Sequence, residues 1–129
     1  MIDRYSRKEL KQIWLDQNRY KLWLDIELAA AEAMEKLKII PKGTVKKVKS
    51  KSKIDVNRIL NLEGKVRHDV IAFLTSVTEK VGKQGSYLHK GMTSSDVLDT
   101  CFNIQLKQSG NIILKDIETL LKSIKKQSI

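Results

Sequence analysis

The chain has few of the residues that stabilise small secreted domains or build metal centres. It contains one cysteine, Cys101, and two histidines among 129 residues. A single cysteine excludes an internal disulfide framework and is typical of a protein of the reducing cytoplasm. One cysteine and two histidines cannot supply the usual ligands of a structural zinc site. We therefore expect a cytoplasmic protein without a metal ion, in which Cys101 is a small core residue.

Long apolar runs are also missing, and proline occurs once. Purely apolar runs are only a few residues long, so neither a transmembrane span nor a secretory signal is expected. Internal repeats, hairpin patterns, and phosphate-loop, dinucleotide and GxSxG signatures are absent. With 129 residues, of which 41% are hydrophobic, the chain is one domain or part of a larger one.

Positive charge is abundant, and the net charge is +10 at pH 7. A lysine cluster without any acid consists of Lys42, Lys46, Lys47, Lys49, Lys51 and Lys53. The cluster lacks the arginine and aromatic residues that base readout and stacking favour, so we interpret it as a solvated helix face and do not expect a nucleic-acid partner. The alternative is a basic helical module that binds nucleic acid or an acidic protein. Nucleic-acid affinity would then fall steeply with salt.

Nearly all of the chain has helical periodicity, so the expected fold class is all-α. The capping-box spacing of Ser6 and Glu9 predicts a short helix that ends at Trp14. A second helix is predicted for residues 16–38, and a short exposed lysine-rich helix follows as far as Ser52. The apolar stripe of the second helix is predicted to be Trp23, Ile26, Ala30, Ala33 and Leu37. Both tryptophans of the chain are interpreted as packing anchors.

Two further helices are predicted before the middle loop. Asp55 can cap the first of them, in which Gly64 is expected to introduce a kink or an end. Helical spacing of apolar residues then resumes over residues 66–81, and Gly82 is a suitable C-terminal stop. A loop is predicted for residues 83–92.

The last predicted helix begins near Ser94 and continues to the end of the sequence, a length of about 50 Å. Gly110 costs about 1 kcal/mol, but the periodicity continues on both sides of it. The early stripe of this helix is Val97, Cys101 and Ile104. The later stripe is Ile113, Ile117, Leu120 and Ile124, which have no obvious partner in the preceding sequence. We therefore expect the later stripe to be exposed and to favour association.

Three polar clusters interrupt the helical pattern and contain both histidines. They are Asp3-Arg4-Tyr5-Ser6, Arg67-His68-Asp69 and the loop His89-Lys90-Gly91-Met92-Thr93-Ser94-Ser95-Asp96. Arginine binds oxyanions through its planar guanidinium group, and a helix start offers free N–H groups to a carboxylate or phosphate. Each cluster alone is also compatible with a surface charge, a local ion pair or an ordinary cap. Together they indicate a site for a multiply charged anion of unidentified class.

The same clusters, in this order and spacing, closely resemble those of the bacterial adenylosuccinate lyases, in the fumarase/aspartase superfamily. The resemblance continues through Val70-Ile71-Ala72-Phe73 and through Val97-Leu98-Asp99-Thr100. It implies a cytoplasmic enzyme of purine biosynthesis that releases fumarate from adenylosuccinate, giving AMP, and from the succinyl-carboxamide imidazole ribotide. It also implies a small-molecule succinyl-nucleotide substrate, no metal or redox cofactor, no membrane partner, and a homotetramer.

The resemblance implies roles for individual residues at both ends of the substrate. Arg4 and Tyr5 would bind the nucleotide phosphate, with His89 nearby. Thr93 and Ser94 would hold the succinyl carboxylate. This role agrees with the independent interpretation of a hydroxyl-rich helix start as a carboxylate site.

The middle cluster would line the substrate pocket between these ends. Arg67, His68 and Asp69 would contact the substrate, and His68 would assist the acid side of the β-elimination. If so, the middle cluster should share one cleft with Thr93 and Ser94. Val66 stands where the family more often has threonine, which is a minor difference.

Members of the family are several hundred residues long, and their principal acid and base lie beyond Ile129 in the matching order. The chain is therefore expected to be a truncated N-terminal fragment that is inactive alone. Residues 1–93 would form an N-terminal helical domain, and residues 94–129 would form the first part of a long central-bundle helix.

Overall fold

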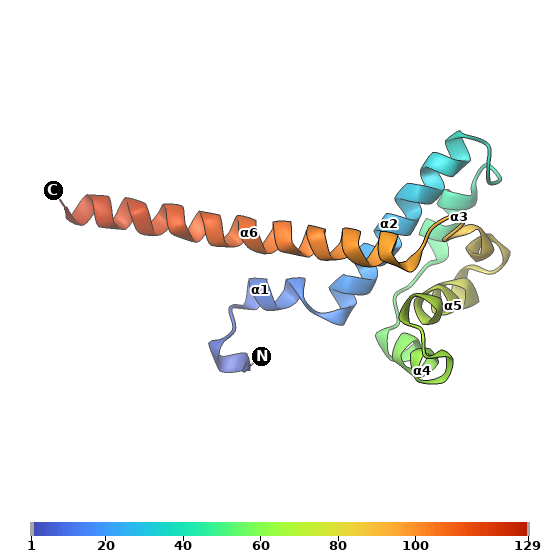
Figure 1. The fold of residues 1–129 in the computed structure, drawn as a ribbon, viewed down its shortest axis with the longest axis horizontal. Coiled ribbons are helices and arrows are strands. Elements are labelled where there is room, and N and C mark those ends of the chain that lie inside the picture. Colours follow the sequence, from blue (N-terminus) through green and yellow to red (C-terminus); the bar gives the residue numbers. More distant parts are fainter. Residues whose placement is uncertain (1, 129) are drawn as a thin grey trace.

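The computed structural model describes residues 2–128, which form helices joined by short connections (Figure 1). No strand occurs in this part of the chain, which confirms the all-α fold class. The elements are η1 (Asp3–Tyr5), α1 (Lys8–Ile13), α2 (Asp16–Lys36), α3 (Thr44–Lys51), α4 (Val56–Val66), α5 (Asp69–Val81), η2 (Lys83–Tyr87) and α6 (Ser94–Gln127), where η marks a 3-10 helix.

Most of the predicted helix boundaries are confirmed, but the helix predicted for residues 66–81 begins at Asp69, because Val66 still belongs to α4. α2 begins at Asp16 but ends at Lys36, because Lys38 takes a left-handed backbone conformation with φ of 60°. Asp55 caps α4, and its Oδ1 accepts the N–H of Arg58 at 3.0 Å. Gly82 ends α5 with φ of 78°. α6 begins at Ser94 and continues through Gly110 without a break, whereas the predicted loop of residues 83–92 contains η2.

The predicted capping box of Ser6 and Glu9 is wrong. α1 begins at Lys8 with Arg7 at the N-cap, and no side chain caps it. The Ser6 hydroxyl donates instead to the carbonyl of Ile2 at 2.9 Å, and Glu9 accepts a hydrogen bond from the Arg7 guanidinium at 3.2 Å. Ser6 therefore closes the preceding 3-10 turn.

The predicted end of the helix at Gly64 is also wrong. α4 continues to Val66 and ends where Arg67 takes a left-handed conformation, with φ of 55°, and donates its N–H to the Glu63 carbonyl at 2.8 Å. A glycine costs a helix only about 1 kcal/mol. The packing of α4 against α5 is sufficient to keep the glycine helical.

An aromatic cluster forms the centre of the core and confirms Trp23 as an anchor. Trp23 is 1% exposed, and its ring centroid lies 5.1 Å from that of Tyr20 and 5.5 Å from that of Phe73, with edge-on geometry in both pairs. Trp14 is a weaker anchor, because it remains 40% exposed while its ring packs edge-on against Phe102 of α6. Such aromatic pairs contribute about 0.5–1.5 kcal/mol beyond the area they bury.

The predicted stripe of α2 is correct for Trp23 and Ile26, which packs against the core, but it is wrong toward the end of the helix. Ala33 and Leu37 are exposed, and Ile26 and Ala30 are only half-buried. The buried residues of the helix are Tyr20, Leu22, Trp23, Leu24, Glu27 and Ala31. The true face therefore includes a carboxylate, and an apolar pattern alone would assign that carboxylate to solvent.

α6 packs on α1 and α2. Its buried residues are Val97, Cys101 and Gln105, which confirms Cys101 as a core residue. The C-terminal part projects away from the other helices (Figure 1). The later stripe is exposed as predicted, with Ile113 50%, Ile117 47%, Leu120 60% and Ile124 54% accessible.

Candidate functional site

The cluster Arg67-His68-Asp69 forms the junction between α4 and α5. Arg67 occupies the left-handed turn after α4, and its side chain is exposed. His68 is the N-cap of α5, where its Nδ1 accepts the N–H of Ile71 at 3.4 Å. Asp69 Oδ1 accepts the N–H of Val70 at 2.7 Å and lies 3.6 Å from His68 Nδ1. The end of α4 positions Arg67, and the start of α5 positions His68 and Asp69.

The cap determines which ring nitrogen of His68 can donate. Because Nδ1 accepts a backbone N–H, the neutral imidazole carries its hydrogen on Nε2. The side chain is 47% exposed, so a ligand can reach it. An accessible Nε2–H is the arrangement that proton donation to a departing group requires.

The start of α6 carries the second group of predicted residues. Thr93 is the N-cap, and its N–H donates to Asp96 Oδ2 at 2.8 Å in a capping box. Within residues 2–128 the backbone N–H groups of Ser94 and Ser95 make no hydrogen bond. Two free N–H groups at the positive end of a 34-residue helix attract a carboxylate or phosphate.

His89 lies in the loop before α6 and is fastened to the core. Its backbone N–H donates to Glu27 Oε2 at 2.7 Å, and its Nδ1 lies 2.6 Å from Glu27 Oε1. Glu27 belongs to α2, and its side chain is fully buried. Sequence reasoning missed this residue. The signal available was an acid on the same helical face as Tyr20 and Trp23.

Arg4 and Tyr5 form the turn η1 at the beginning of the described chain. The Arg4 guanidinium lies 4.8 Å from the centroid of the Tyr5 ring, and Tyr5 is 74% exposed. The following segment is joined to α6 by an ion pair between Arg7 and Asp116. The side chains of Arg4 and Tyr5 are both exposed, so a ligand can reach them.

The predicted residues belong to three different segments between or before the helices. The loop of residues 89–96 lies between η2 and α6, residues 67–69 lie between α4 and α5, and residues 4–5 precede α1. In the part of the chain that the structure describes, no hydrogen bond or ion pair joins these three groups. The shared cleft expected for the last two clusters stays a prediction.

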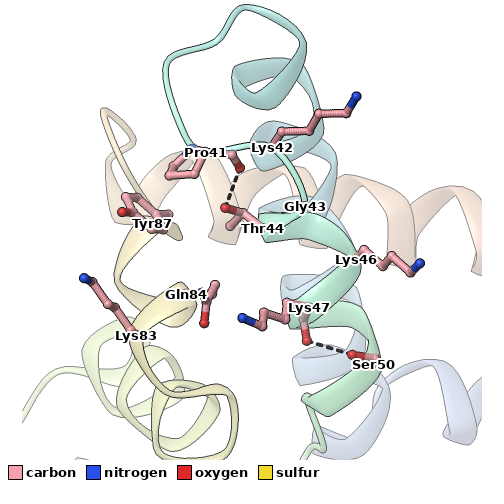
Figure 2. A pocket seen from close by; sticks show the side chains of 10 residues that line it. All are labelled: Pro41, Lys42, Gly43, Thr44, Lys46, Lys47, Ser50, Lys83, Gln84 and Tyr87. Atoms are coloured by element: carbon pink, nitrogen blue, oxygen red, sulfur yellow. Dashed lines mark hydrogen bonds between the residues drawn. The ribbon is translucent and has the colours of Figure 1, made fainter.

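A pocket of about 530 Å³ lies between α3 and η2 and contains none of the predicted site residues (Figure 2). Lys47 of α3 extends toward Gln84 of η2, whereas Lys42 and Lys46 point away from the space between the two elements. The six residues of the lysine cluster are all exposed, which fits the interpretation of a solvated face. Lys83 and Tyr87 also line this pocket, and no local pattern in the sequence connects them with α3.

Two further features, a metal-binding cluster and a membrane-spanning helix, are absent from the described residues. Residues 2–128 contain no group of three or more histidine, cysteine, aspartate or glutamate side chains arranged to hold a metal ion. None of the helices in the same range is both long and apolar enough to cross a membrane.

The fold of this chain is similar to that of a solved structure. The chain superposes on a crystal structure of fumarate lyase from Mesorhizobium sp. BNC1 with a TM-score of 0.81, over 92% of this chain and 30% of that chain. The sequences are 22% identical, so this likeness concerns the fold. This chain therefore shares its fold with about 30% of that fumarate lyase chain.

A family model described as "Lyase" matches residues 1–129, and the chain belongs to this lyase family. Adenylosuccinate lyase of Bacillus subtilis is 44% identical and that of Synechocystis sp. 48% identical, each over 99% of this chain and 30% of the relative. Adenylosuccinate lyase of Staphylococcus saprophyticus is 46% identical over 94% of this chain and 28% of the relative. The chain thus spans about 30% of the length of the curated relatives it matches.

Proposed function

We propose that this chain is the N-terminal part of an adenylosuccinate lyase, which cleaves adenylosuccinate to AMP and fumarate. The observation that carries the proposal is identity of 44–48% with proteins of that name over 94–99% of this chain. The helix start at Ser94 adds physical support, because its free N–H groups suit a carboxylate of the succinyl group. The succinyl-carboxamide imidazole ribotide would be the second substrate.

The proposed reaction is a β-elimination. A base removes a proton from the carbon next to a carboxylate, and negative charge develops on that carboxylate. The electron pair then forms the new C=C bond of fumarate as the C–N bond breaks, and the departing nitrogen takes a proton. Thr93, Ser94 and the free N–H groups would stabilise the developing charge, which is the largest contribution in many such sites.

The other two clusters would bind the substrate and help to protonate its departing nitrogen. His68, with its hydrogen on Nε2, would assist protonation of the departing nitrogen. Arg67 and Asp69 would line the same pocket. Arg4 and Tyr5 would bind the nucleotide phosphate with His89, since guanidinium, hydroxyl and imidazole N–H groups all donate to phosphate oxygens.

The projecting part of α6 supports the proposed assembly (Figure 1). Residues 1–93 would form an N-terminal helical domain, and residues 94–129 would begin a long helix of a central bundle. The exposed later stripe of α6 supports packing against further helices. In a cytoplasmic homotetramer, the three separated clusters could be completed by other subunits.

The test is fumarate formation from adenylosuccinate, followed by ultraviolet absorbance. A full-length polypeptide that carries this sequence should be active, whereas residues 1–129 alone should not. The family's principal acid and base lie outside residues 1–129, and each is typically worth about 10²–10⁴-fold in rate. An inactive full-length protein would contradict the assigned reaction, and turnover by the isolated chain at the full-length rate would contradict the assignment of acid and base.

A further inference from the structure

Glu27 is the only charged residue among the buried residues of the described range 2–128. Its side chain has no exposed surface, and the nearby core contains Tyr20 and Trp23 of the same helix face. Burial of a carboxylate is unfavourable unless hydrogen bonds compensate it. Both oxygens of Glu27 receive such compensation from a single residue, His89, which lies 62 positions away in the sequence.

The two contacts hold His89 in an uncommon conformation. Its φ is 60°, in the left-handed region that few residues other than glycine adopt. Oε2 accepts the backbone N–H at 2.7 Å and Oε1 lies 2.6 Å from Nδ1, so one carboxylate fixes both the main chain and the ring. Strained backbone of this kind persists where surrounding groups determine it, and it is frequent at binding sites.

The same contacts select one ring nitrogen of His89 for a ligand. A carboxylate can only accept, so Nδ1 carries a hydrogen and donates it to Oε1. Nε2 makes no hydrogen bond in the described chain and is not among its buried unpartnered atoms, so it has accessible surface. A protonated imidazole would then donate from Nδ1 to Glu27 and from Nε2 to an external anion.

We propose that Glu27 is a positioning residue, which holds the His89 loop and directs Nε2 to the phosphate of the substrate. This inference rests on the proposed function, because that function supplies the phosphate. Glu27 itself does not touch the substrate. Its role resembles that of the carboxylates that hydrogen-bond the second ring nitrogen of a metal-binding histidine. Removal of such a carboxylate typically lowers metal affinity or activity by about 10–100-fold.

The positioning is tested first without any enzyme assay, by two-bond ¹⁵N–¹H correlation spectra of the 129-residue chain. In the wild type, the hydrogen of neutral His89 should lie on Nδ1. In Glu27→Gln, the amide can donate to Nδ1, so the hydrogen should move to Nε2. The same tautomer in both proteins would overturn the proposal.

The second test uses the full-length protein with adenylosuccinate and with the same compound lacking its phosphate. Glu27→Gln should lower kcat/KM for the phosphorylated substrate by about 10–100-fold, mainly through KM, because the amide facing Nδ1 cannot accept a hydrogen from the protonated ring that binds phosphate through Nε2. It should affect the other substrate much less. The control is Gln105→Ala, which removes the hydrogen bond of another buried polar residue, to the Ile13 carbonyl at 2.7 Å. The control should leave the preference for phosphate unchanged.

His89→Asn provides a second variant that should fold, because asparagine tolerates left-handed backbone and retains a donor for Glu27. It should lose the same phosphate preference, and combining it with Glu27→Gln should add little. An equal loss for both substrates in Glu27→Gln would overturn the positioning role alone. Absence of fumarate release by the wild type would overturn the proposed function, while the spectra would still decide whether Glu27 orients the ring.

Discussion

His68 caps α5 and, in the proposed reaction, donates a proton, and substitution can separate these roles. His68→Asn keeps an N-cap acceptor, so its thermal stability should stay close to that of the wild type. Its turnover in the full-length protein should fall about 10²–10⁴-fold because the acid group is lost. His68→Ala should lose the same turnover and up to about 1 kcal/mol of stability. Fumarate release and thermal unfolding measure the two effects, and normal turnover in either variant would exclude His68 from the site.

Ser94 offers a cleaner test of substrate binding, because its hydroxyl makes no hydrogen bond in the described part of the chain. Ser94→Ala should therefore change the free energy of unfolding by less than about 0.5 kcal/mol. In the full-length protein it should raise KM and lower kcat, since a hydrogen bond to a charged group is worth about 1.5–3 kcal/mol. Ser95→Ala at the next position is the matched control and should have a smaller effect. Equal kinetics for the two variants would contradict the role of Ser94.

Individual residues differ in how far the sequence could predict their environment. Trp23 and Cys101 were predicted as core residues, because large aromatic and small thiol side chains on an apolar face are usually buried. Glu27 was not predicted, because its burial depends on His89, which lies 62 positions away. Helical periodicity contains no information about such a distant partner. The buried face of α2 therefore includes Glu27, which the predicted apolar stripe did not contain.

At the scale of elements, α2 also caps α3. The carboxylate of Glu35 accepts the N–H of Gly43 at 2.6 Å and that of Val45 at 3.0 Å. These backbone hydrogen bonds lower the pKa of Glu35 below its ordinary value of 4.5. Because the folded pKa is lower than the unfolded one, the stabilisation is present above about pH 4.5 and is lost as pH falls through the folded pKa.

Glu35→Gln should therefore reduce stability at neutral pH and flatten its decline in acid. Denaturant unfolding between pH 7 and pH 3 measures both effects. The matched control is Glu32→Gln in the same helix, where the native carboxylate pairs only with exposed Lys36 at 3.0 Å. Such surface pairs contribute little, so the control should resemble the wild type. An unchanged acid profile in Glu35→Gln would contradict the capping role.

Helix boundaries were predicted well where one local interaction determines them. Asp55, Gly82 and Ser94 were correct because a side-chain cap or a positive φ acts within one turn. The predicted N-cap at Ser6 was wrong because its hydroxyl donates to the carbonyl of Ile2, which is equally close in the sequence. Gly64 failed for a different reason, since the tertiary packing of α4 on α5 outweighs the weak preference of one glycine.

At the scale of the whole molecule, the local geometry of the candidate site was predictable, but its assembly was not. The sequence predicted a helix start near Ser94, which is correct, and a helix over residues 66–81, which begins three residues later, at Asp69. The arrangement of residues 67–69 relative to Thr93 and Ser94 depends on how helix pairs pack, and α4 packs with α5 whereas α6 packs with α1 and α2. Spacing in the sequence does not encode that choice.

The projecting part of α6 is the largest apolar feature that the fold leaves uncovered. Its later stripe, Ile113, Ile117, Leu120 and Ile124, is about half exposed or more, and Leu114 and Leu121 beside it are similarly accessible. Contiguous apolar patches on soluble proteins usually mark sites of association. Burial stabilises by about 25 cal/mol per Å² of apolar surface, so pairing of this helix with a copy of itself or with other helices is favoured.

The 129-residue chain should therefore self-associate in a concentration-dependent way, measured by sedimentation equilibrium. Replacing Ile117 and Leu120 together with glutamine should shift the population toward monomer, because the stripe loses its apolar centre. The control replaces Lys115 and Lys122 with glutamine, since helical geometry places both away from the stripe. That control should associate as the wild type does. A wild-type chain that is monomeric at all concentrations would contradict the expectation that this surface drives assembly.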